Sequence, residues 1–170
     1  MGANVVAAAS TDEKVALAQS RGAASGMVYP RGPFDKDGTK ALAAQFKGAV
    51  GDNGADVIYD AVGGDYAEAA LRAVAWKGRF LVIGFPAGIP RIPLNLALLK
   101  GCEIVGVFWG SFTKRELEAN AENNRELMAM YAEGKIKPHV SKTFALEDAG
   151  AAISELAERR AMGKVVVTID

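Results

Sequence analysis

Short apolar runs alternate with amphipathic stretches along the first half of the chain. Four runs rich in valine, isoleucine and alanine predict buried strands at residues 4–9, 26–29, 56–62 and 79–85. Between them, apolar residues recur every three or four positions and predict helices after Ser10, Asp35 and Gly64. This alternation is typical of an α/β fold: a doubly wound (Rossmann-like), mostly parallel sheet with helices on both faces.

The second half of the chain is less regular. After several prolines, the pattern predicts a short amphipathic segment over 94–100 and a strand from Glu103 to Trp109. Capping-box spacing predicts the start of two helices along the chain. Ser10 and Glu13 predict a helix to about Arg21, and Thr113 and Glu116 predict a long helix that stops at Gly134. The pattern then predicts a last helix, which ends at Gly163, and a final strand over 164–170.

Composition mainly excludes classes of function. The 170 residues are 50% apolar, enough for one domain with a core, and 20 basic residues balance 20 acidic ones, which argues against nucleic acid and membrane partners. The single Cys102 and the single His139 exclude an internal disulfide and a Cys/His zinc site. No apolar run approaches the roughly 20 residues of a membrane span, and no secretion signal opens the chain. We therefore expect a metal-free, cytoplasmic domain.

A dinucleotide-binding fold should begin with a strand, a Gly-x-Gly-x-x-Gly turn and a helix whose N-terminus holds the pyrophosphate. The chain opens instead on what resembles the second strand of such a fold. Gly63 and Gly64 do follow a strand, but Asp65 comes next, and its carboxylate would repel phosphate. In the turn over 84–88, Pro86 removes a backbone donor. We interpret neither turn as the phosphate loop.

Five segments, at residues 7–14, 56–65, 78–85, 104–110 and 131–135, carry a family resemblance. In this order and spacing they resemble the C-terminal, cofactor-binding portion of zinc-independent quinone oxidoreductases of the medium-chain dehydrogenase/reductase superfamily. The resemblance extends from Gly2 to Val167. It implies that residues 1–170 are a single truncated dinucleotide-binding domain, without the N-terminal catalytic domain, the first strand and the glycine-rich turn.

The lost strand would be central, because the usual strand order is 3-2-1-4-5-6. The strands at 4–9 and 56–62 would then each lose a neighbour. We expect the gap to close by direct pairing of these two strands or by insertion of a second chain. The last strand would also lack its partner, because the resemblance implies that it returns toward the catalytic domain. The truncation could be engineered, proteolytic or a late-assigned gene start.

The tip of the first strand indicates which nicotinamide cofactor fits. An NAD enzyme places an acidic residue there, on the ribose hydroxyls. This chain has Ser10 at the tip and Lys14 one helical turn later, which suits the 2′-phosphate of NADPH. The resemblance implies that Tyr29 flanks the same phosphate. The alternative is that Ser10 is only an N-cap, Lys14 a solvated residue and Tyr29 an edge aromatic.

Other strand ends would face the nicotinamide. The resemblance implies that the ring and its ribose are surrounded by small and apolar residues at these ends: Ala61, Val62, Gly84, Phe85, Phe108 and Trp109. Alternatively, Val62, Ile83 and Phe108 belong to the core. Asp60 is better interpreted as an acceptor for loop N–H groups than as an acid catalyst. No residue is assigned a catalytic role, since the chain holds no nucleophile–base pair.

The resemblance implies hydride transfer from NADPH to a quinone or a conjugated enone in the intact protein. It also implies a homodimer formed through the strand from Glu103 to Trp109. We expect the isolated 170-residue chain to be inactive. The rival interpretation is a non-catalytic dimerising Rossmann-like fragment that binds nucleotide weakly or not at all. A third interpretation is an enoyl-thioester or alcohol reductase of the same superfamily.

Overall fold

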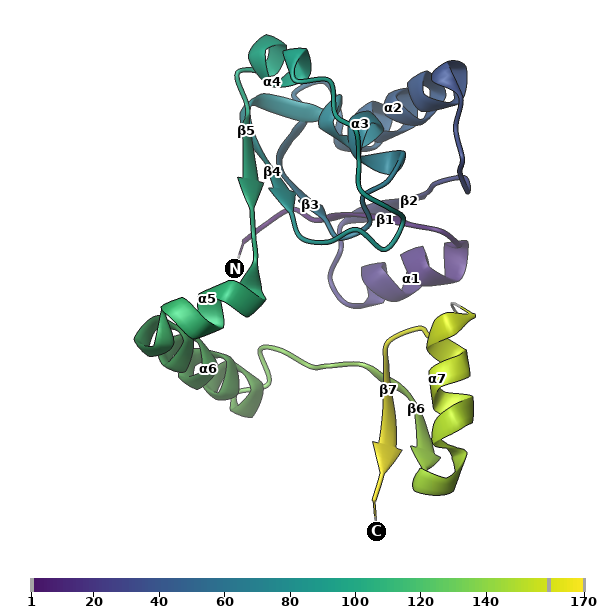
Figure 1. The fold of residues 1–170 in the computed structure, drawn as a ribbon, viewed down its shortest axis with the longest axis vertical. Coiled ribbons are helices and arrows are strands. Elements are labelled where there is room, and N and C mark those ends of the chain that lie inside the picture. The colour runs from purple at the N-terminus through teal and green to yellow at the C-terminus, as the bar shows by residue number, and fades with distance from the viewer. Residues whose placement is uncertain (1, 159, 170) are drawn as a thin grey trace. The chain divides into compact units, whose positions relative to one another are not determined.

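Strands and helices alternate from Val6 onward, as the sequence predicts. The computed structural model describes residues 2–158 and 160–169, and two compact units divide between Phe108 and Trp109. The first unit contains, in order, β1 (Val6–Ala9), α1 (Asp12–Ser20), β2 (Ser25–Val28), α2 (Lys36–Val50), β3 (Ala55–Asp60), α3 (Tyr66–Leu71), β4 (Val74–Val82), α4 (Asn95–Lys100) and β5 (Glu103–Gly106) (Figure 1).

Every strand pair in this unit is parallel. β1 pairs with β2, and β3, β4 and β5 form a second sheet in that order. Figure 1 shows α1 on one side of β1 and β2, and α2 with α3 on the other. The predicted α/β fold with parallel strands and helices on both faces is confirmed.

The predicted direct pairing of β1 with β3 is wrong. Neither strand has a second strand neighbour among the described residues, and a cavity of about 820 Å³ lies between them. The helix layer explains the separation, because Leu42 and Ala43 of α2 pack against Ala69 of α3. That cluster fixes the spacing of the two halves, so the strands could meet only if the helices slipped past each other. Closure of the gap by a second chain stays a prediction.

The core of the first unit lies between the β3-β4-β5 sheet and the helices beside it. Five buried residues form its main cluster: Ala67, Leu71, Val74, Phe80 and Leu96. Cys102 packs at the margin of this cluster and is half-buried. The fully enclosed side chain of Phe80 identifies β4 as the central strand of the sheet.

Two expected helix signals are wrong. The N-cap of α1 is Thr11 rather than Ser10, because the extended Thr11 backbone lets its hydroxyl accept from the Lys14 N–H (3.4 Å). Thr113 lies inside a helix, where its hydroxyl donates to the Gly110 carbonyl (3.2 Å) and so is not available to cap the next helix. The helix predicted after Gly64 is α3, which ends at Leu71, because Val74 already pairs with Ala55.

The second unit begins with a helix where the sequence predicted the end of a strand. β5 ends at Gly106, and Trp109, predicted as the last residue of the strand, is the first residue of α5. The elements of this unit are α5 (Trp109–Arg115), α6 (Leu117–Ala132), β6 (Val140–Ala145), the 3-10 helix η1 (Leu146–Asp148), α7 (Ala149–Ala157) and β7 (Lys164–Thr168). The prediction that the last strand lacks a partner is wrong, since β7 pairs in parallel with β6. Its predicted end at Asp170 lies outside the described residues.

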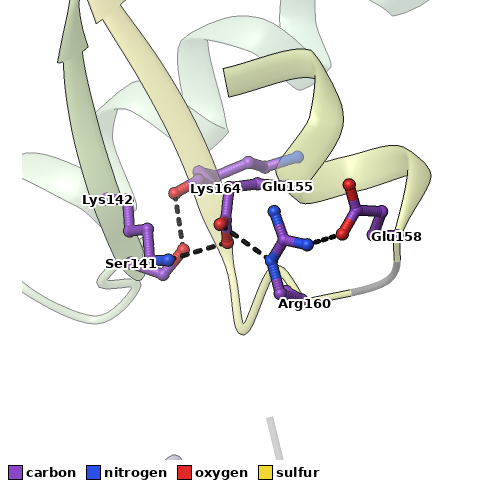
Figure 2. A network of polar contacts seen from close by, with 6 residues as sticks. All are labelled: Ser141, Lys142, Glu155, Glu158, Arg160 and Lys164. Atoms are coloured by element: carbon purple, nitrogen blue, oxygen red, sulfur yellow. Dashed lines mark hydrogen bonds and ion pairs between the residues drawn. The ribbon is translucent and has the colours of Figure 1, made fainter. Parts of the chain in front are cut away.

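A polar network holds α7 against β6 in this unit (Figure 2). The Glu155 side chain is 9% exposed, with Lys142 Nζ 2.8 Å from its Oε2 and Arg160 Nε 3.0 Å from its Oε1. Arg160 also pairs with Glu158. Hydrogen bonds from Lys142 and then Arg160 hold the pKa of Glu155 below its ordinary value of 4.5.

Glu155→Gln should therefore change how stability depends on pH. A carboxyl group whose pKa is lower in the folded chain stabilises the fold above pH 4.5, and this stabilisation is lost as pH falls through the folded value. We expect the variant to melt at a lower temperature than the parent near neutral pH, and the difference to shrink below pH 4.5. Thermal unfolding followed by circular dichroism measures this. Glu126→Gln, at an exposed position of α6 outside this network, is the control; an equal effect there would contradict the assignment.

Candidate functional site

The three residues expected at the cofactor phosphate lie together at the ends of β1 and β2. Ser10 follows β1, and Tyr29 follows β2 and donates its N–H to the Ala9 carbonyl (2.9 Å). From the first turn of α1, Lys14 places its Nζ 3.5 Å from the Ser10 hydroxyl. Ser10, Lys14 and Tyr29 are all half-buried. Lys14 and Ser10 are thus in contact through their side chains, and Tyr29 follows the neighbouring strand. We name these three residues the strand-tip patch.

The charge of the strand-tip patch is mixed. Asp12 and Glu13 occupy the same first turn of α1 as Lys14. The pKa of Glu13 lies below its ordinary value, because its own backbone N–H and then the Thr11 hydroxyl donate to its carboxylate. Glu13 is thus negatively charged at neutral pH. Asp12 and Glu13 therefore place negative charge in the same turn as Lys14.

At the end of β3, Asp60 organises the loop that follows. Its carboxylate is buried, and Oδ1 accepts from the N–H groups of Val62 (3.0 Å) and Gly63 (2.9 Å). These contacts are the ones expected of a structural acceptor. They leave Ala61 exposed and Val62 half-buried at the strand end.

The two glycine-containing turns bond to each other. Gly64 N–H donates to the Gly88 carbonyl (2.7 Å), and Ala87 N–H donates to the Val62 carbonyl (3.0 Å). Gly88 N–H in turn donates to the Phe85 carbonyl (2.8 Å). A phosphate loop needs several backbone N–H groups directed at the ligand. Here these groups are already engaged, which agrees with the interpretation that neither turn holds pyrophosphate.

The remaining predicted residues come from the ends of β4 and β5 and from the start of α5. Gly84 is half-buried and Phe85 is exposed, both at the end of β4 beside the Asp60 loop. Phe108 follows β5 with 77% of its surface exposed, so it is not a core residue. Trp109, also exposed, begins α5 in the second unit.

Tyr66 is a site residue that the sequence reasoning missed. Its hydroxyl accepts from the Gly32 N–H (3.0 Å), and its ring lies 5.0 Å from Tyr29 and 5.3 Å from Phe34 between centroids. Tyr66 therefore fixes the position of Tyr29 and of the loop after it. The signal available in the sequence was a tyrosine on an apolar helix face, where the hydroxyl requires a partner.

Two other kinds of site are absent from the part of the chain that the structure describes. Within residues 2–158 and 160–169, no three His, Cys, Asp or Glu side chains gather where they could hold a metal ion. In the same part of the chain, no helix is both long and apolar enough to cross a bilayer.

Comparison with known proteins gives consistent matches. The zinc-binding dehydrogenase family profile matches residues 33–167. The chain is 37% identical over 168 residues to quinone oxidoreductase-like protein 2 of Rattus norvegicus, which covers 98% of this chain and 46% of that protein. The chain spans about half the length of the curated relatives it matches.

Solved structures share the fold. A quinone oxidoreductase of Pseudomonas syringae is 28% identical with a TM-score of 0.74, over 99% of this chain and 50% of that one. The Escherichia coli quinone oxidoreductase complexed with NADPH has a TM-score of 0.81 at 23% identity, again over 99% of this chain and 50% of that one.

Proposed function

The chain belongs to the zinc-binding dehydrogenase family, and we propose that it is the nucleotide-binding part of an NADPH-dependent oxidoreductase that reduces a quinone or a conjugated enone without zinc. The similarity to quinone oxidoreductases, one of them complexed with NADPH, supports this proposal. We place the protein in the cytoplasm. The chemistry belongs to the intact protein, and the chain alone should be inactive.

The observation that carries the proposal is the strand-tip patch. The 3.5 Å separation of Lys14 Nζ and Ser10 Oγ places a cation and a hydroxyl where one phosphate oxygen could contact both. Tyr29, held by Tyr66, would border the same phosphate. NAD recognition would require a carboxylate at the end of β1, and none occupies that position.

When bound, NADPH supplies the hydride. The protein's contribution would be to orient the nicotinamide and to exclude water. Small or apolar groups at the strand ends of the first unit, Ala61, Val62, Gly84, Phe85 and Phe108, would border the ring. Asp60 would act indirectly, by fixing the loop that carries Ala61 and Val62.

A second candidate function is a non-catalytic module that binds nucleotide weakly or not at all. The engaged N–H groups of Gly63, Gly64 and Ala87 favour it, because they leave no loop ready for pyrophosphate.

Fluorescence titration with NADPH and NADH separates the two candidates. We expect micromolar binding with a preference for NADPH. Ser10→Asp should weaken NADPH binding at least tenfold and spare NADH, because a carboxylate repels the 2′-phosphate. Ser20→Asp, at the far end of α1, carries the same charge change as a control. Absence of saturation at millimolar NADPH would support the second candidate function. Equal losses of NADPH affinity in both variants would show that Ser10 does not contact the phosphate.

We also propose that the chain dimerises through β5, predicted from Glu103 to Trp109. β5 is an edge strand, with Ile104 and Val107 partly exposed. Val107 N–H donates to Val82 of β4, so the Ile104 backbone groups point to the outer edge. Sedimentation should show a dimer for the parent and a monomer for Ile104→Pro, which removes an edge donor. A monomeric parent would contradict the proposal.

A further inference from the structure

The loop between β2 and α2 contributes a positively charged residue beside the strand-tip patch. Residues 29–35 have the sequence Tyr-Pro-Arg-Gly-Pro-Phe-Asp, and Arg31 is the only basic residue among them. Arg31 is exposed. We propose that Arg31 is a further specificity-determining residue, which binds the 2′-phosphate of NADPH together with Ser10 and Lys14. This inference rests on the proposed function, because it adds a residue to the same phosphate site.

The charge of the first turn of α1 is poorly matched to a phosphate. A phosphate monoester carries close to two negative charges at neutral pH. Lys14 is the only basic residue of α1, and its first turn also holds Asp12 and Glu13. Two carboxylates thus accompany a single ammonium group. A second cation close to the site would offset this excess of negative charge and would favour the phosphate.

The loop is fixed on both sides of Arg31. On one side, Tyr29 donates its N–H to the Ala9 carbonyl (2.9 Å), which continues the parallel ladder past the end of β2. On the other side, Gly32 donates its N–H to the Tyr66 hydroxyl (3.0 Å). The backbone of Arg31 therefore lies between two hydrogen-bonded anchors, and its position at the end of β2 is well defined.

The aromatic residues of the loop pack inward and leave Arg31 outside. The rings of Tyr29 and Phe34 both contact the Tyr66 ring, with centroids 5.0 Å and 5.3 Å from it. All three rings pack against the buried cluster that joins α2 to α3. Arg31 is not part of this cluster. Its exposed side chain is therefore accessible to a ligand.

Arg31 lies close enough to Ser10 to share a phosphate with it. The strand register pairs Ala9 with Val28. Ser10 and Tyr29 are therefore the next residues side by side. Neighbouring strands are about 4.8 Å apart, and two residues of chain span at most about 7 Å. The Cα atoms of Arg31 and Ser10 are thus within roughly 12 Å, which a long arginine side chain and a phosphate group together bridge. The planar guanidinium group can form two parallel hydrogen bonds with a phosphate.

The test measures how adenosine 2′,5′-bisphosphate and 5′-AMP bind to the 170-residue chain, by isothermal titration calorimetry. The two probes differ only by the 2′-phosphate, and the parent chain should bind the bisphosphate more tightly. Arg31→Gln should weaken bisphosphate binding about tenfold, the loss typical of one hydrogen bond between charged groups, and should leave 5′-AMP binding unchanged. Arg21→Gln, at the far end of α1, removes the same charge and should change neither affinity.

Tyr66 acts through Arg31 and is a positioning residue. Tyr66→Phe keeps the ring but removes the hydroxyl that accepts from the Gly32 N–H. This variant should weaken binding of the bisphosphate alone, by about three- to tenfold. Combined with Arg31→Gln it should cause no further loss, because the hydroxyl acts only through Arg31. Weaker binding of both probes, or losses that add in the double variant, would contradict this role.

The outcomes distinguish failure of this inference from failure of the proposed function. A preference for the bisphosphate that Ser10→Asp abolishes and Arg31→Gln leaves intact would overturn the inference alone. Equal losses in Arg31→Gln and Arg21→Gln would also overturn it, because the effect would then come from the overall charge of the chain. A parent chain that binds the bisphosphate no more tightly than 5′-AMP, or binds neither, would overturn both.

Discussion

Phe80→Ala should lower the free energy of unfolding by about 3–5 kcal/mol, the usual cost of emptying a fully enclosed aromatic site. The Phe80 side chain has no exposed surface and lies in the central strand β4, packed with Leu71, Val74 and Leu96. A typical domain has only about 5–15 kcal/mol of stability in total. We therefore expect the first unit to be close to unfolding at room temperature. Urea denaturation followed by circular dichroism gives the value.

Phe108→Ala is the matched control for this measurement. The same atoms are removed from a side chain that is 77% exposed, so the expected change is below about 0.5 kcal/mol. Similar losses in the two variants would show that Phe108 is covered in solution, and the exposed position assigned to it would be wrong.

Gly64→Ala has the second largest expected effect. Gly64 has a φ of +56°, and a Cβ at this position would lie 2.5 Å from the carbonyl oxygen of Ala87. The left-handed backbone costs a residue with a side chain about 1–2 kcal/mol, and overpacking adds about 1–3 kcal/mol. We expect the free energy of unfolding to fall by about 2–5 kcal/mol in total, measured by the same denaturation experiment. The hydrogen bonds between the two glycine-containing turns should also be lost.

Gly48→Ala should have the opposite sign. Gly48 lies in α2, and a Cβ there would meet no other atom within 4 Å. Replacing glycine by alanine in a helix stabilises it by about 0.5–1 kcal/mol. If the two alanine variants lowered stability equally, the contact between the Gly64 turn and Ala87 would not be the cause of the loss.

The first unit was predictable because its signals are local. The apolar run that became β1, the Asp35 cap of α2 and the turn at Gly63 each depend on a few adjacent residues. β6 was missed because Ser141, Lys142 and Thr143 give it no apolar run. It is a strand through its pairing with the distant β7, which no local pattern reveals.

The candidate site was predictable in part for the same reason. Ser10 and Lys14 are one helical turn apart, so the sequence already places them together. Tyr66 joins Tyr29 through a contact between α3 and the end of β2, which depends on how the helices pack. The gap between β1 and β3 was expected from the missing central strand, but the prediction that these strands pair directly was wrong, because the packing of α2 against α3 keeps them apart.

The pairing of strands also has a consequence for the order of folding. Every ladder joins a strand to the next strand along the chain: β1 to β2, β3 to β4, β4 to β5, and β6 to β7. Contacts between near neighbours in sequence form quickly, because they close short loops. Within the part of the chain that the structure describes, no ladder requires the two ends to meet. Each strand–helix–strand piece can thus assemble as soon as it leaves the ribosome, before the following piece has been synthesised.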